Sequence, residues 1–276
     1  SVLYWKMLSH RINNTTFLRI ISAMAHVLLV LGLLVLVVQD AHAASSDVSE
    51  AAATVSIDMG NDFWKLAIPD ATSQTVRIVL NQQSHRKSDA FVGFRGYDGR
   101  FFASDAKSFA PRMPDNMISG LALLQATRLD EVQRVARGVF KYHFNMSEDG
   151  DTQEVRVHVP VKGVAGSPRG THLSFSAQEL LGMMFGFAKS TTERDADIHV
   201  RNAVVVVPAS YNSLQKRAVI NAAALAGVRT TALLHATTAA AIQFAVQNPP
   251  ASSSDGGTAS KLVLILDCGA TKTEAG

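Results

Sequence analysis

Two short loops carry the residue types best suited to binding a nucleotide phosphate. Each follows a run of β-forming residues and has the pattern Asp-x-Gly, with Asp58 and Gly60 in one loop and Asp267 and Gly269 in the other. Glycine has no Cβ, so backbone N–H groups can approach phosphate oxygens closely. An aspartate fixed at a strand end can bind Mg²⁺ directly or through water. One such loop is common in α/β proteins, but two that flank a long α/β segment predict a clamp that closes on ATP from two lobes.

The first half of the chain is rich in β-forming residues. Thr54–Ile68 alternates in polarity around the first loop, and Thr75–Leu80 predicts a further strand. Residues 90–94 and 100–103 predict a hairpin, because glycines and an aspartate at 96–99 favour a tight turn.

The second half predicts alternating helices and strands. Apolar residues at helical spacing predict a helix over Asp115–Val139. Ser176 and Glu179 form a capping-box pattern at the start of another helix, expected to end near Arg194. The β-branched run at 202–207 predicts a buried parallel strand. Short strands, then β-α-β-α, then a second Asp-x-Gly loop are the order of two-lobed ribonuclease-H-like ATP-binding proteins.

Composition predicts four segments. Residues 1–43 are interpreted as a signal peptide with its true start at Met7, and 44–247 as the first lobe of a nucleotide-binding domain. Residues 248–260 have the composition of a linker, and 261–276 are expected to form the first strand and phosphate loop of a second lobe. Because the second lobe breaks off after its loop, the sequence is interpreted as an N-terminal fragment.

The expected signal peptide has the order of a secretory segment. Two arginines precede an apolar run at 20–38, and a small-residue motif follows that ends at Ala43, the predicted cleavage site. The run is also long enough to span a bilayer, so an uncleaved anchor is the alternative. In either case the remaining chain is expected to be translocated, with membrane contact only during that step.

Two further features bear on the compartment. Asn145-Met146-Ser147 matches the acceptor pattern for N-glycosylation, whereas similar patterns at Asn13 and Asn14 lie in the expected signal. The lone cysteine excludes an internal disulfide framework, which is unusual for an extracellular protein, and the lumen of the endoplasmic reticulum fits better.

The overall composition is that of a globular protein. Apolar residues make up 47% and charged residues 18%, and the formal net charge is +3. No basic stripe with interleaved aromatic residues is present, so nucleic acid is not an expected partner.

Residues 202–246, NAVVVVPASYNSLQKRAVINAAALAGVRTTALLHATTAAAIQFAV, resemble the nucleotide-binding domain of the heat-shock-protein-70 family. SIDMGNDFWKLAI at 56–68 and IVLNQQSHRKSDAFVGF at 78–94 resemble its large endoplasmic-reticulum branch, the glucose-regulated or hypoxia-up-regulated type. The resemblance implies an α/β, actin-like ATPase lobe with a mixed sheet flanked by helices. It also implies ATP or ADP with Mg²⁺, unfolded client proteins, and conventional family members and J-domain proteins as partners.

The resemblance carries nine nucleotide-binding residues onto this chain. They are Asp58, Gly60, Asn61, Asp62, Lys65, Asp267, Gly269, Ala270 and Thr271, with Asp58 and Asp267 as the Mg²⁺-side carboxylates. Lys65 can also be explained as a solvated residue of a strand.

The chain departs from the family pattern at positions that serve hydrolysis. Asn61 and Asp62 replace two hydroxyl residues, and Asp62 adds a carboxylate that repels a γ-phosphate. Ala236 stands where the family has its hydrolytic glutamate, and the family's catalytic lysine has no counterpart within 118–124. No catalytic residue is therefore assigned, and the expected behaviour is nucleotide binding with weak or absent hydrolysis.

Three functions remain open from the sequence. The first is an endoplasmic-reticulum chaperone or co-chaperone that binds ATP and has a possible nucleotide-exchange role. The second is an active ATP-hydrolysing chaperone in which neighbours such as Lys272 replace the lost groups. The third, a sugar or acetate kinase of the same superfamily, is disfavoured by the Val-Pro-Ala and Ala-Ala-Ala-Ile stretches.

Overall fold

The computed structural model describes residues 2–7, 53–70, 75–138, 144–161, 171–249 and 262–276. Ala43, the apolar run at 20–38 and most of the expected linker lie outside them. Among the helices described, none combines the length and apolar character needed to cross a bilayer.

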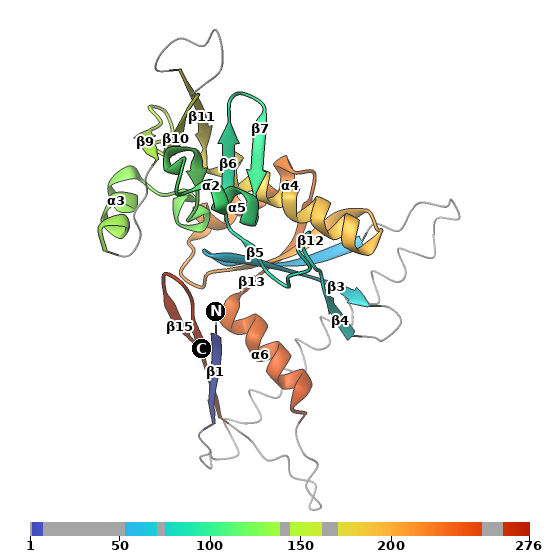
Figure 1. The fold of residues 1–276 in the computed structure, drawn as a ribbon. Coiled ribbons are helices and arrows are strands. Elements are labelled where there is room, and N and C mark those ends of the chain that lie inside the picture. Colours follow the sequence, from blue (N-terminus) through green and yellow to red (C-terminus); the bar gives the residue numbers. More distant parts are fainter. Residues whose placement is uncertain (1, 8–52, 71–74, 139–143, 162–170, 250–261) are drawn as a thin grey trace, which may run out of the picture.

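A mixed sheet forms the centre of the described fold (Figure 1). Its strands lie in the order β13 (Arg229–His235), β12 (Val200–Val207), β2 (Ala53–Met59), β3 (Phe63–Asp70) and β4 (Thr75–Ile78), with β5 (Ser88–Asp89) paired to β3. Strand β12 is parallel to both β13 and β2, whereas β2, β3 and β4 pair antiparallel. The predicted buried parallel strand and the predicted mixed sheet are confirmed.

Helices cover both faces of this sheet (Figure 1). Helices α4 (Ala177–Ala196) and α5 (Ser213–Leu225) pack together on one side, and α6 (Ala236–Gln247) lies on the other. The predicted capping box starts α4: the Ser176 hydroxyl accepts from the Glu179 N–H, and the Glu179 carboxylate accepts from the Ser176 N–H. Phe185 of α4 is fully buried and meets the Trp64 ring edge to face, with 5.1 Å between ring centroids.

Smaller elements surround this core. In the described part of the chain, three further sheets have the strand orders β7-β6-β8, β11-β10-β9 and β1-β14-β15. The strands are β6 (Val92–Arg95), β7 (Gly99–Phe102), β8 (Met117–Ile118), β9 (Asn145–Glu148), β10 (Val155–Pro160), β11 (His172–Ser176), β1 (Val2–Met7), β14 (Val263–Cys268) and β15 (Thr273–Ala275). The remaining helices are α2 (Ala103–Phe109), η1 (Pro114–Asn116), η2 (Leu121–Leu124) and α3 (Leu129–Gly138). The predicted hairpin corresponds to β6 and β7 and is confirmed.

The single helix predicted over Asp115–Val139 is wrong. Those residues form η1, β8 and η2 before α3 begins at Leu129. Gly120 adopts φ +68°, a left-handed conformation that interrupts a right-handed helix. The apolar residues that suggested one helical face are instead buried in separate short elements, as at Ile118, Leu121 and Leu124.

The position of the core gives a stability prediction. Leu181 on α4 is fully buried, so Leu181→Ala is expected to lower the free energy of unfolding by about 2–5 kcal/mol. Leu214 on α5 is 68% exposed, and Leu214→Ala is the matched control, expected to change it by about 0.5 kcal/mol or less. Urea unfolding followed by circular dichroism measures both; equal effects would contradict this placement of the core.

Candidate functional site

A cavity of about 800 Å³ lies at the carboxyl ends of β2 and β12, beside the start of α6 and the loop between β14 and β15. All nine residues predicted to bind a nucleotide line it: Asp58, Gly60, Asn61, Asp62, Lys65, Asp267, Gly269, Ala270 and Thr271. The structure therefore brings together two loops that are far apart in the sequence, and the volume is that of a small-molecule site.

Strand register places the first loop at this cavity. In the parallel pair of β2 and β12, Asp58 lies opposite Val206, and in the pair of β12 and β13, Val207 lies opposite His235. Three strands thus end at the same edge of the sheet. The side chain of Asp58 and the first turn of α6, beginning at Ala236, both line the cavity there.

The turn after Asp58 is tight and holds a polar side chain without a partner. A Cβ on Gly60 would clash with the carbonyl oxygen of Phe63, so glycine permits this turn. The amide nitrogen and oxygen of Asn61 are both buried, with no hydrogen-bond partner among the described residues. Because buried amides are rarely left unpaired, a ligand that accepts or donates hydrogen bonds fits this loop.

The charges that line the cavity favour a cation together with an anionic ligand. The charged side chains of the lining are four carboxylates and two ammonium groups, so the lining is net negative: Asp58, Asp62, Glu131, Asp267, Lys65 and Lys272. Asp58 and Lys65 form an ion pair of 2.5 Å. The net negative lining repels a triphosphate that enters the cavity unless a divalent cation accompanies it.

Asp58 and Asp267 fit the requirements of Mg²⁺. No group of three or more potential metal-ligating side chains occurs in the described part of the chain. Mg²⁺ is commonly bound through one or two carboxylates, with phosphate oxygens and water as its remaining ligands, so two aspartates at the cavity suffice.

The second loop is tied to the loop after β12 through Glu274. The Gly269 N–H donates to the Lys272 carbonyl at 2.8 Å, which closes the turn. Lys272 Nζ donates to Glu274 at 2.6 Å, and the Ala209 N–H, in the loop after β12, donates to the same carboxylate oxygen at 3.0 Å. Burial alone would raise the pKa of Glu274, but these hydrogen bonds outweigh it and lower the pKa below its usual value.

A lysine that sequence reasoning missed lies on α2. The helix that follows the early strands is α2, and it carries Lys107; the segment 118–124, where a lysine was sought, contributes to β8 and η2. Residues 118–124 contain no lysine, as expected, but they are not part of the helix that follows the early strands. Lys107 Nζ lies 2.5 Å from Asp89 and 5.4 Å from the ring centroid of Phe63, a residue of the cavity wall. Lys107 lies in the short segment that directly follows the predicted β6–β7 hairpin, and that position could have identified it from the sequence.

The start of α6 presents no carboxylate to the cavity. Ala236 is its first residue and contributes only a methyl group, while His235, the N-cap residue, makes no side-chain capping bond. The His235 imidazole instead lies 3.1 Å from Lys216 Nζ on α5. Across the cavity, the buried Tyr211 hydroxyl donates to the Ala122 carbonyl, and burial raises its pKa.

The mixed sheet, its helices and the two glycine loops at one cavity define an actin-like ATPase fold. A family model described as Hsp70 protein matches residues 54–275, and the chain belongs to that family.

Individual relatives agree with this assignment. The chain is 30% identical to hypoxia up-regulated protein 1 of Xenopus laevis over 200 residues, which cover 72% of this chain and 29% of that protein. It is 29% identical to the Homo sapiens protein of the same name, with 82% of this chain and 21% of that protein covered. It is 27% identical to heat shock 70 kDa protein 16 of Arabidopsis thaliana, with 80% and 27% covered. The chain thus spans less than a third of the length of these relatives.

The contacts of Glu274 with Lys272 and with the loop after β12 give a pH prediction. Because the folded-state pKa of Glu274 is lowered, its ionised form stabilises the fold above the unfolded value of about 4.5, and this contribution is lost as the pH falls through the folded value. Glu274→Gln is expected to be less stable than the parent at pH 7, and the difference is expected to shrink below pH 4.5.

Urea unfolding at several pH values measures this difference. Glu148→Gln, at the end of β9 and away from the cavity, is the control and is expected to change stability little at any pH. A Glu274→Gln deficit that stays constant down to pH 3 would contradict the role given to this carboxylate.

Proposed function

We propose that this chain provides the ATP-binding part of a chaperone or co-chaperone of the endoplasmic reticulum, and that it binds MgATP with weak or absent hydrolysis. The observation that carries the proposal is the convergence of nine predicted residues from two distant loops on one cavity. Family membership supports a nucleotide as the ligand. Asp58 and Asp267 would hold Mg²⁺, and the Asn61 amide would contact phosphate.

Weak turnover is supported by the start of α6. Phosphoryl transfer to water needs a group that positions the attacking water, and Ala236 supplies none where the family has a glutamate. Asp62 adds negative charge to the same wall. A nucleotide that is bound but not cleaved can still shift an equilibrium between open and closed lobes.

The wider role follows from the family and from the N-terminal segment. We propose cleavage after Ala43, a first lobe over residues 44–247, a linker over 248–260 and the start of a second lobe over 261–276. Unfolded proteins would be the clients. Conventional family members and J-domain proteins would be the partners, with nucleotide exchange on a conventional member as one possible task.

One observation favours an active ATPase as the second candidate. Lys107 and Lys87 both lie near the ring of Phe63 at the cavity wall, with Lys87 Nζ 3.9 Å from the centroid. A lysine there could move toward a γ-phosphate and neutralise developing charge. If steady turnover is observed, Lys107→Met is expected to lower it at least about tenfold, with ATP affinity changed much less.

Binding should depend strongly on the metal. In the longest form of the protein that carries this chain, ATP affinity is expected to fall at least about tenfold when Mg²⁺ is removed with a chelator, because the lining is net negative. Asp58→Asn is expected to weaken MgATP binding by a similar factor. Asp151→Asn, an exposed position off the cavity, is the matched control. Calorimetry measures the ATP affinity in all three cases. An affinity that does not depend on Mg²⁺ would contradict the proposed metal-assisted site.

Hydrolysis tests the role of position 236. Ala236→Glu is expected to raise single-turnover ATP hydrolysis at least about tenfold, because it restores a carboxylate that can position water. Ala239→Glu adds the same charge to the same wall one helical turn later, and is expected to give no gain. Fast hydrolysis by the unaltered chain would instead establish the second candidate.

A further inference from the structure

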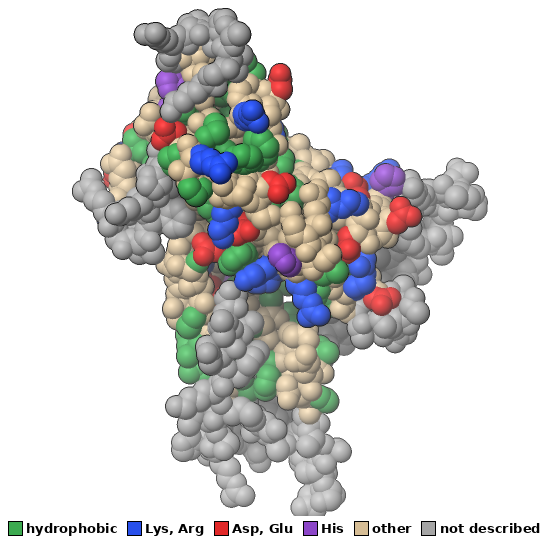
Figure 2. Space-filling model, viewed as in Figure 1, with side chains coloured by type: hydrophobic (Ala, Val, Ile, Leu, Met, Phe, Trp, Pro, Cys, Tyr) green, Lys and Arg blue, Asp and Glu red, His purple; other side chains and the backbone are tan. Residues whose placement is uncertain are grey.

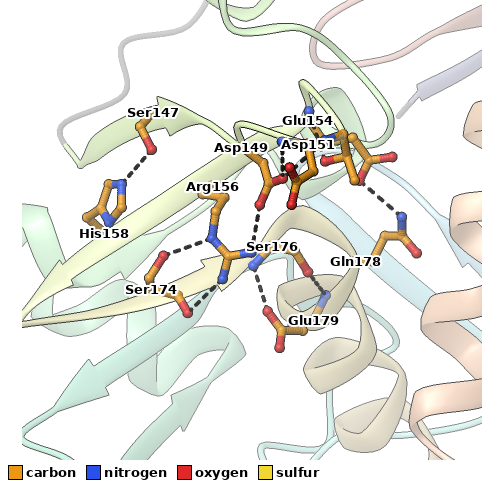
Figure 3. Close-up of polar contacts among 11 residues, drawn as sticks. Ser147, Asp149, Asp151, Glu154, Arg156, His158, Ser174, Ser176, Gln178 and Glu179 are labelled. Carbon is orange, nitrogen blue, oxygen red and sulfur yellow. Dashed lines mark hydrogen bonds and ion pairs between the residues drawn. The ribbon is translucent and has the colours of Figure 1, made fainter.

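The sheet formed by β9, β10 and β11 has one inner and one outer face. In β10, Val155, Val157 and Val159 are buried, whereas Arg156 and His158 between them are only partly buried. Side chains alternate across a strand, so Arg156 and His158 share the outer face. Figure 3 shows both side chains with Ser147 and Ser174 on the same side of the ribbon.

Asn145 belongs to this outer face. It lies opposite His158 in the antiparallel pair of β9 and β10, and Ser147 lies opposite Arg156. Directly paired residues share a face, so the Asn145 side chain projects on the polar side of the sheet. Asn145 is exposed, while Ser147 is partly buried, and the Ser147 hydroxyl lies 2.7 Å from His158 Nε2.

Strand β9 is an edge strand among the described residues. The sheet order is β11-β10-β9, so no described strand pairs with the other side of β9. Free edges of this kind pair readily with other chains unless they are covered or charged. A bulky hydrophilic group beside this edge would block such pairing, and no residue of β9, β10 or β11 lines the nucleotide cavity.

Residues 145–147 contain the complete acceptor sequence for N-glycosylation. Asn145, Met146 and Ser147 satisfy the Asn-x-Ser pattern, with no proline at the middle position. A pyrophosphoryl-lipid oligosaccharide is the donor class. The Asn145 amide nitrogen bonds to the first sugar carbon, the bond from that carbon to the pyrophosphate oxygen breaks, and the lipid pyrophosphate leaves as the amide loses one proton.

We propose that Asn145 carries an N-linked glycan that projects from the outer face of the β9-β10-β11 sheet and shields the β9 edge. The proposal rests on the proposed passage into the endoplasmic reticulum. It places the glycan at a distance from nucleotide chemistry, because the cavity is built from other elements of the fold.

Translation in the presence of microsomes tests the glycan and the location separately. The chain is made once with its own N-terminus and once with residues 1–43 replaced by a known cleavable signal, and protease protection reports passage into the vesicles. Transfer occurs on the emerging chain, so the assay does not require this chain to fold. The protected product is expected to show a single glycan shift that an N-glycan amidase removes.

Three variants identify the acceptor. Asn145→Gln and Ser147→Ala are expected to abolish the shift, and Ser147→Thr is the matched control that keeps the acceptor pattern and the shift. A protected chain without the shift, or a shift that persists in Asn145→Gln, would overturn the proposal. A shift seen only with the replacement signal would support the glycan and contradict the proposed location.

Discussion

The parallel pairing of β2 with β12 is the constraint on which the rest of the site depends. It joins residues 53–59 to residues 200–207, far apart in the sequence, and its register sets Asp58 opposite Val206. A shift of this register by one residue would exchange the buried and outward faces of the shifted strand. It would also remove Asp58 from the cavity. Ile57 and Val205, paired in that register and almost fully buried, oppose such slippage. The position of Asp58 is thus fixed by core packing.

Much of this arrangement could be predicted because its signals are local. The capping box at Ser176 and the left-handed Gly227 after α5 depend on hydrogen bonds and backbone angles within a few residues. The run at 202–207 has a composition typical of a strand buried on both faces. The two glycine loops are recognisable for the same reason: a Cβ would clash with the Phe63 carbonyl oxygen at Gly60 and would crowd the Lys272 carbonyl oxygen at Gly269.

What the sequence did not predict depends on contacts between distant residues. The apolar spacing at 115–139 is compatible with a helix, and only packing in three dimensions divides it into short elements around Gly120. Lys107 was missed because α2, at 103–109, lies before the segment that was expected to form the first helix. The bond from the Ala209 N–H to Glu274 connects residues 65 positions apart, and no local pattern marks either one as a partner.

Nucleotide binding and turnover in an ATPase depend on different residues. Binding depends on strand register, two glycine turns and a pair of aspartates, and all of these are present at the cavity. Turnover depends in addition on a group that positions water, and the α6 start offers a methyl group at Ala236. The β2–β12 register, the capping box at Ser176 and the turn at Gly60 do not involve the side chain at position 236, the first residue of α6. A chain under selection for nucleotide-dependent closure alone can therefore lose that carboxylate while the register that places Asp58 is retained.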